Sequence, residues 1–104
     1  MKALPEGAEP YKRTPTFTAH TVPAGLLKQH TTKEGGWAKI VVLQGRLLYR
    51  ILSPESREYC LSPDVHGVVE PSVPHEVQPQ GEVEFYVEFY RAPTSAGDSL
   101  AGGR

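Results

Sequence analysis

The sequence predicts a single all-β domain with a jelly-roll architecture. Roughly eight or nine short segments of strand type follow one another, and turn residues separate them every few positions. Ten prolines and ten glycines are spread along the chain and do not cluster, which is typical of turns in an all-β domain. The clearest alternation of apolar and polar side chains runs through Val83–Arg91, and no stretch has the pattern of a long helix.

Length and composition exclude several classes of protein. The 104 residues are the size of one domain. Eleven basic and twelve acidic side chains give a formal net charge of −1, which argues against nucleic acid or an acidic membrane surface as the main partner. Cys60 is the single cysteine, so no internal disulfide forms. The chain lacks a secretory signal pattern and an apolar run of membrane-spanning length, and we expect a cytoplasmic protein.

The first third of the chain is predicted to contribute an arm and two strands. Residues 1–14 hold prolines, a glycine and several charges, so we expect an arm without a regular element. A weak alternation from Pro15 to Val22 indicates an edge strand, which Pro23 ends. The next predicted strand is Leu26–Thr31, in which Leu26, Lys28 and His30 share one side.

The most apolar run in the sequence, Trp37–Gln44, predicts a central strand because its length and β-branched residues favour a strand over a helix. Gly45 is expected to end this strand. Arg46–Leu52 would then return beside it as the second strand of a hairpin.

The rest of the chain predicts four further strands, at Glu58–Leu61, His66–Glu70, His75–Gln78 and Val83–Arg91. A hairpin turn at Pro79–Gly81 would separate the last two, and the apolar face of the last strand would lie in the core. The tail from Thr94 has one large apolar residue and is expected to be disordered. We therefore divide the chain into an arm (1–14), a β domain (15–93) and a tail (94–104).

Two histidines from distant parts of the chain, His30 and His75, are the main candidates for a functional site. Imidazole nitrogens suit zinc, iron, nickel or copper, and a catalytic site uses about three protein ligands with one position open. A third ligand would have to be Glu34, Glu88, His20 or His66. Alternatively, the two histidines form hydrogen bonds inside a polar pocket and bind no metal. The neighbours of Glu88 on its strand favour a solvated or subunit-facing surface for this carboxylate.

Other side chains are candidates for ligand contacts. Arg46 and Arg50 share one face of a strand, where two guanidinium groups could bind an oxyanion. Such a pair more often lies on the solvent-exposed face of a hairpin. Trp37 follows two glycines and could line the mouth of a pocket, although it is more often a core residue. Cys60 is expected to be a buried, inert packing residue.

Several short motifs resemble the cupin superfamily, namely Gly67, Pro71 and Pro74-His75, with Gly25 and His30 upstream and Gly45 between them. More narrowly, the chain resembles the small TehB/YeaR-like family over roughly residues 4–93. The segments that carry this narrower resemblance are Ala24-Gly25 with His30, Leu43-Gln44-Gly45, Pro74-His75 and Glu88–Pro93.

The resemblance implies a double-stranded β-helix barrel with a pocket at one end, and a homodimer. Family members occur alone or as the N-terminal half of tellurite-resistance methyltransferases, and they are linked by name to tellurite or nitrosative stress. Of the usual metal ligands, His30 and His75 carry over. Thr32 stands where a second histidine is usual, and Val73 replaces a customary glycine. We therefore expect a pocket for a divalent metal (zinc, iron or nickel), a small anionic ligand or both. The alternative is a non-catalytic sensing or dimerisation module with a metal-free pocket.

Overall fold

The computed structural model describes residues 1–27 and 36–92. These residues form an antiparallel β domain whose helical content is one short 3-10 turn, η1 (Ala24–Leu27). The strands are β1 (Glu9–Arg13), β2 (Phe17–Thr18), β3 (Gly36–Ile51), β4 (Arg57–Leu61), β5 (Gly67–Val69) and β6 (His75–Arg91). No helix in the described part of the chain has the length and apolar character needed to cross a membrane.

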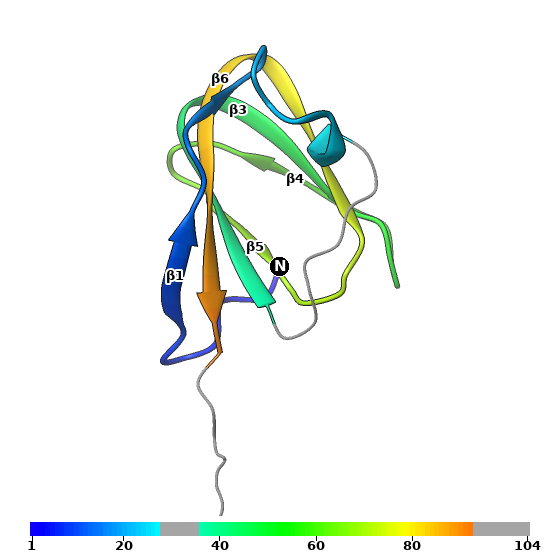
Figure 1. Cartoon of the computed structure of the whole chain (residues 1–104). Helices are drawn as coiled ribbons and strands as arrows, with labels where there is room; N and C mark the ends of the chain where they lie inside the picture. The colour runs from blue at the N-terminus through cyan, green and yellow to red at the C-terminus, as the bar shows by residue number, and fades with distance from the viewer. Residues whose placement is uncertain (28–35, 93–104) are drawn as a thin grey trace, which may run out of the picture.

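Two long strands, β3 and β6, pair with each other along nearly their whole length and organise the sheet (Figure 1). The first half of β3 also pairs with β5, and its second half pairs with β4. The other edge of β6 pairs with β1 and β2. The strand order is therefore β1-β6-β3-β4, with β2 on β6 and β5 on β3. This path is open at β1 and β4, and the closed jelly-roll barrel stays a prediction.

Both long strands bend in the middle, and this corrects two predicted hairpins. Leu43 is an extra residue in β3, and the three residues 80–82 of β6 lie opposite Arg46 alone. Gly45 and Gly81 take positive φ angles of 84° and 80° in these bulges. A glycine in this conformation allows a strand to bulge and bend without reversing. The predicted chain reversals at Gly45 and at residues 79–81 are therefore wrong, and each strand continues.

The bend turns the two halves of the sheet toward each other, and the core lies between them. Figure 1 shows β3 and β6 curving together over one end of the molecule. Side chains from both halves form one buried cluster: Ala38, Ile40, Val42, Leu47, Tyr49, Leu61, Val69, Val77, Val83 and Phe85. The alternation expected in the last strand is confirmed, since Val83 and Phe85 are buried while Glu84 is exposed.

The segment before β3 differs most from the prediction. We expected no regular element before Thr14, but β1 lies within this arm and pairs with the edge of β6. Its five side chains are all exposed, so the sequence carries no alternation that would reveal it. The predicted edge strand shortens to β2, and Leu26 and Leu27, which were expected to begin the next strand, belong to the 3-10 turn η1. The remainder of that predicted strand, and the tail from Thr94, lie outside the described residues.

The strands predicted at 58–61 and 66–70 are confirmed as β4 and β5.

Candidate functional site

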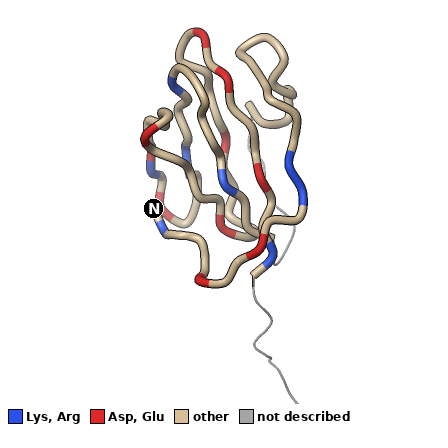
Figure 2. Tube along the Cα trace, turned by 90° about the vertical axis from the view of Figure 1, so that its left-hand side faces the viewer, with Lys and Arg blue, Asp and Glu red and all other residues tan. Residues whose placement is uncertain are grey.

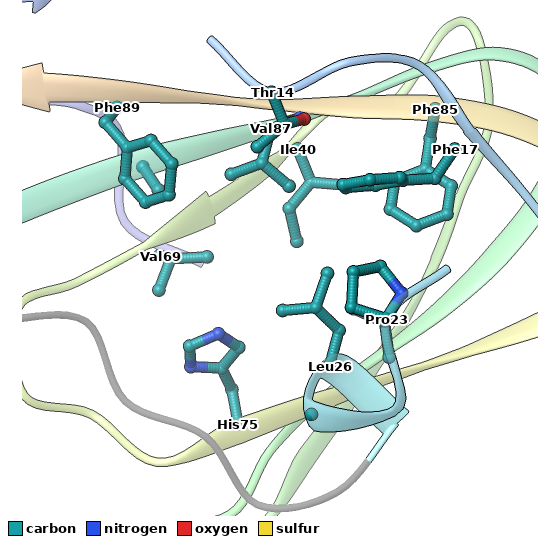
Figure 3. Close-up of a pocket in the computed structure, with 13 residues that line it drawn as sticks. Thr14, Phe17, Pro23, Leu26, Ile40, Val69, His75, Phe85, Val87 and Phe89 are labelled. Carbon is teal, nitrogen blue, oxygen red and sulfur yellow. The ribbon is translucent and has the colours of Figure 1, made fainter. Parts of the chain in front are cut away.

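A pocket of about 320 Å³ lies between the two halves of the bent sheet (Figure 3). One wall is the inner face of β3, β5 and β6, and another is the segment that leads from β1 through η1. The described residues that line it are Thr14, Phe17, Pro23, Gly25, Leu26, Ala38, Ile40, Val69, His75, Val77, Phe85, Val87 and Phe89. Nearly all of these side chains are apolar, so the pocket is a hydrophobic site with few polar groups.

His75 is the buried polar residue of this site, with 5% of its surface exposed. It is the first residue of β6, and the neighbouring turn is anchored because Leu52 N donates a hydrogen bond of 2.9 Å to Pro74 O. Its imidazole points from the strand into the pocket between Val69 and Leu26 (Figure 3). The edge of the ring also packs against Tyr49, with ring centroids 5.9 Å apart.

The hydrogen bond at Nδ1 decides the tautomer of His75. This nitrogen lies 2.9 Å from the backbone oxygen of Val73. A carbonyl oxygen only accepts, so Nδ1 carries the proton and donates it. Nε2 is then the nitrogen that bears the lone pair in the neutral ring. Metal-binding histidines typically show this arrangement, in which one ring N–H is held by a carbonyl or a carboxylate and the other nitrogen binds the metal.

Only some of the side chains predicted to bind a metal together with His75 are among the described residues. His30 and Glu34 lie outside the described residues. In residues 1–27 and 36–92, no group of three His, Cys, Asp or Glu side chains is placed to hold a metal ion. His20 and His66, the other candidates for a third ligand, are exposed, and neither lines the pocket.

Glu88 lies on the opposite face of β6 from Val87 and Phe89, so the structure does not bring it to His75. Its carboxylate accepts hydrogen bonds from Arg13 Nη2 at 3.0 Å and from the Tyr90 hydroxyl at 2.7 Å. These bonds, with that from Tyr90 contributing most, lower the pKa of Glu88. Burial and the bond to Glu88 raise the pKa of Tyr90 to about 12. Glu88 therefore ties β1 to β6 on the outer face of the sheet.

The lowered pKa of Glu88 predicts a pH-dependent contribution to stability. The ionised carboxylate is favoured in the folded protein, so its contribution is present above the ordinary glutamate pKa of about 4.3 and is lost as the pH falls through the lower, folded value. We expect Glu88→Gln to destabilise the protein by about 1 kcal/mol at pH 7. Urea unfolding at pH 7 and pH 3 measures this difference, which should shrink at the lower pH. Glu84→Gln, at an exposed position of the same strand, is the control and should change little. A difference that grows in acid would contradict the assignment.

The other predicted contact residues also lie outside the pocket. Arg50 faces two glutamates directly across the sheet, Glu58 on β4 and Glu76 on β6, and forms ion pairs with both. Its guanidinium group is therefore already engaged by two carboxylates. Arg46 is exposed, and neither arginine lines the pocket.

Trp37 and Cys60 also differ from their expected positions, because each side chain lies on a different face of its strand from the one expected. Trp37 lies opposite Tyr90 on the face of β3 that turns away from Ala38 and the pocket, so it does not line the pocket mouth. The expected burial of Cys60 is wrong, because its side chain is exposed.

Sequence reasoning missed the wall formed by Thr14, Phe17, Pro23 and Leu26. Thr14 holds this segment on β6, because its backbone N donates to Val87 O at 2.9 Å and its hydroxyl accepts from Val87 N at 3.0 Å. Phe17 then packs edge-on against Phe85, with centroids 5.7 Å apart. Phe17 was the one large apolar residue in a weakly patterned segment, and this was the available signal.

Comparison with known proteins shows similarity to one protein family and to solved structures. The model of the TehB-like domain matches residues 12–87. The chain is 32% identical over 85 residues to the probable S-adenosyl-L-methionine-dependent methyltransferase TehB of Haemophilus influenzae, and the match covers 77% of this chain and 30% of that protein. The crystal structure of TehB from Haemophilus influenzae superposes with a TM-score of 0.77 and 29% identity, over 84% of this chain and 32% of that chain. The chain thus spans about a third of the length of TehB.

Two other solved structures share the fold. A protein from Escherichia coli K12 has a TM-score of 0.82 and 21% identity, and the match covers 90% of this chain and all of that one. Hydroxypropylphosphonic acid epoxidase from S. wedmorenis has a TM-score of 0.54 and 18% identity, over 70% of this chain and 40% of the epoxidase. At these identities the likeness concerns the fold alone.

Proposed function

The chain belongs to the TehB-like family, and we propose that it is a small cupin-like domain that binds a divalent transition metal and a small molecule in the pocket between the two halves of its sheet. His75 is the proposed metal ligand within the described residues. The observation that carries the proposal is the buried imidazole at the pocket wall, whose Nδ1 is held by the Val73 carbonyl.

The donor chemistry of the site fits such an ion. With Nδ1 held by the Val73 carbonyl, Nε2 is the nitrogen through which His75 would coordinate a metal ion. Imidazole suits zinc, iron and nickel. We propose His30 as the second ligand, because the resemblance to metal-binding cupins carries over to this position, and Glu34 as the third. A bound divalent ion would polarise an oxygen atom of a small molecule.

The test is a measurement of metal content with matched histidine variants. Protein purified without chelator is dialysed against nickel or zinc and analysed by elemental analysis and titration calorimetry. We expect close to one ion per chain in the parent, and a loss of most of this metal in His75→Ala and His30→Ala. His66→Ala removes an exposed histidine and should keep the metal. Substoichiometric metal in the parent, or equal loss in His66→Ala, would refute the metal site.

A second candidate function is a non-catalytic binding or sensing module with a metal-free pocket. The apolar lining favours it, since catalysis by polar side chains needs more polar groups than the described walls supply. In the same experiment this candidate predicts little metal in the parent and in every variant. A homodimer and a role in tellurite or nitrosative stress stay predictions that follow from the resemblance, and a cytoplasmic location stays a prediction from the sequence pattern.

A further inference from the structure

We infer that the pocket binds an uncharged molecule with an aromatic or hydrocarbon body, about the size of a bicyclic ring, and not a free oxyanion. The inference rests on the proposed function in treating this pocket as the ligand site, and it adds the class of ligand. It stands on three observations: the apolar walls, the placement of the charged side chains, and the size and opening of the pocket.

The walls offer contacts to carbon atoms. Phe17, Phe85 and Phe89 line the pocket together with branched aliphatic side chains from β3, β5 and β6. Phe17 and Phe85 form an edge-to-face pair, an arrangement that an added aromatic ring can extend. Thr14 contributes a hydroxyl, but this hydroxyl already bonds the backbone of Pro15 and Val87. His75 is the other polar side chain among the described lining residues, so ligand affinity must come mainly from apolar contact.

The cationic side chains among the described residues lie outside the pocket. In residues 1–27 and 36–92, no lysine or arginine lines the pocket. Arg13 and Arg50 are engaged by carboxylates outside the pocket, Arg13 by Glu88 and Arg50 by Glu58 and Glu76. Figure 2 shows basic and acidic residues interspersed along the strands and not gathered at one site. Moving an anion from water into an apolar pocket without a paired cation is costly, so an oxyanion such as tellurite or phosphate is a poor ligand for these walls.

Size and access fit a small organic molecule. The pocket of about 320 Å³ is roughly twice the volume of an engineered apolar cavity of about 150 Å³ that binds benzene. It also lies at the lower end of the range of roughly 300–1,000 Å³ for small-molecule sites. Pro23 and Gly25 line the pocket and are themselves exposed, so it reaches the surface beside η1.

The test compares probes that share a ring and differ in charge. Titration calorimetry is carried out with 2-naphthol, 2-naphthalenesulfonate, inorganic phosphate and tellurite, on protein stripped with EDTA and on protein loaded with nickel. In stripped protein we expect 2-naphthol to bind at least tenfold more tightly than the sulfonate, and phosphate and tellurite to give no measurable binding. In stripped protein, equal or tighter binding of any of the anions would overturn the inference.

A pair of variants locates the binding. Ala38 is buried and lines the pocket, so Ala38→Leu places added carbon atoms in the cavity. It should weaken 2-naphthol binding at least tenfold while raising the melting temperature of the ligand-free protein or leaving it unchanged. Gln44→Leu introduces the same side chain at an exposed position of the same strand and should leave binding unchanged. A 2-naphthol affinity that survives Ala38→Leu would place the probe outside the pocket and overturn the inference.

Metal analysis of the same samples separates this inference from the proposed metal site. Binding of 2-naphthol to stripped protein, together with no nickel uptake, would refute the metal site and support the ligand class. Stoichiometric nickel without 2-naphthol binding in either sample would support the metal site and overturn the ligand class.

Discussion

Gly45→Ala is expected to lower the free energy of unfolding by about 3 kcal/mol or more, because two costs add at this position. The φ angle of Gly45 is 84°, a conformation that costs a residue with a side chain roughly 1–3 kcal/mol. In addition, a Cβ atom here would overlap the backbone oxygen of Glu82 in β6. Glu82 lies in the bulge of β6 directly before Val83, which pairs with Gly45, so its backbone oxygen cannot move aside without disturbing the bend of the sheet. Urea unfolding, or a fall in melting temperature of about 12 °C or more, measures the effect.

Gly81 provides the matched control for this prediction. Its φ angle of 80° is nearly the same, but a Cβ atom at Gly81 would meet no atom within 4 Å. Gly81→Ala therefore carries the conformational cost without the overlap, and we expect a loss of about 1 kcal/mol. Equal losses of stability from the two substitutions would show that the close approach of β3 and β6 at Gly45 adds no cost to Gly45→Ala.

Tyr49→Ala is expected to cost about 3–5 kcal/mol, because Tyr49 joins the two halves of the sheet across the core. Its side chain is fully buried. Its ring packs against Tyr59 on β4 and against His75, and its hydroxyl donates to the backbone oxygen of Val68 on β5 at 3.0 Å. The substitution removes a large buried ring, and it also leaves the Val68 carbonyl without this donor.

Tyr49→Phe separates the hydrogen bond from the packing. It keeps the ring and removes the hydroxyl, so we expect a loss of about 1–2 kcal/mol from the carbonyl left without this donor. Burial raises the pKa of Tyr49, so the phenol stays neutral and the difference should not change between pH 6 and pH 9. Urea unfolding of both variants at these pH values measures it. A cost for Tyr49→Phe as large as that for Tyr49→Ala would contradict a packing role for the ring.

Strands with a local pattern could be predicted, while their connections could not. The alternation in residues 83–91 and the apolar run from Trp37 both mark strands that the structure contains. At Gly45 and Gly81 the same signal, a glycine between two strand patterns, fits either a hairpin turn or a bulge within one strand. Which of these forms depends on the neighbouring strand. Each half of β3 pairs with β6, so both strands bend and neither reverses its direction.

The candidate site was also predicted only in part, because some of its features follow from local pattern and others from contacts between distant segments. The inward position of His75 follows from the alternation of β6, which places it on the same side as Val77. The resemblance of Pro71 and Pro74-His75 to a cupin motif also indicated His75 as a candidate site residue. Its tautomer depends on the carbonyl of Val73, which no sequence pattern reveals. The balancing of Arg50 by Glu58 and Glu76 depends on the register of three strands.

The residues alone determined that this chain is a β domain of TehB-like type with His75 as a candidate site residue, because side-chain alternation, turn residues and short motifs extend over a few neighbouring positions. The tertiary structure decided which strands bend, which segment closes the pocket, and which charges face outward. Those outcomes depend on contacts between residues far apart in the chain, such as Thr14 with Val87 and Tyr49 with Val68. The free energy of such contacts depends on distance in space, and a one-dimensional pattern does not contain that distance.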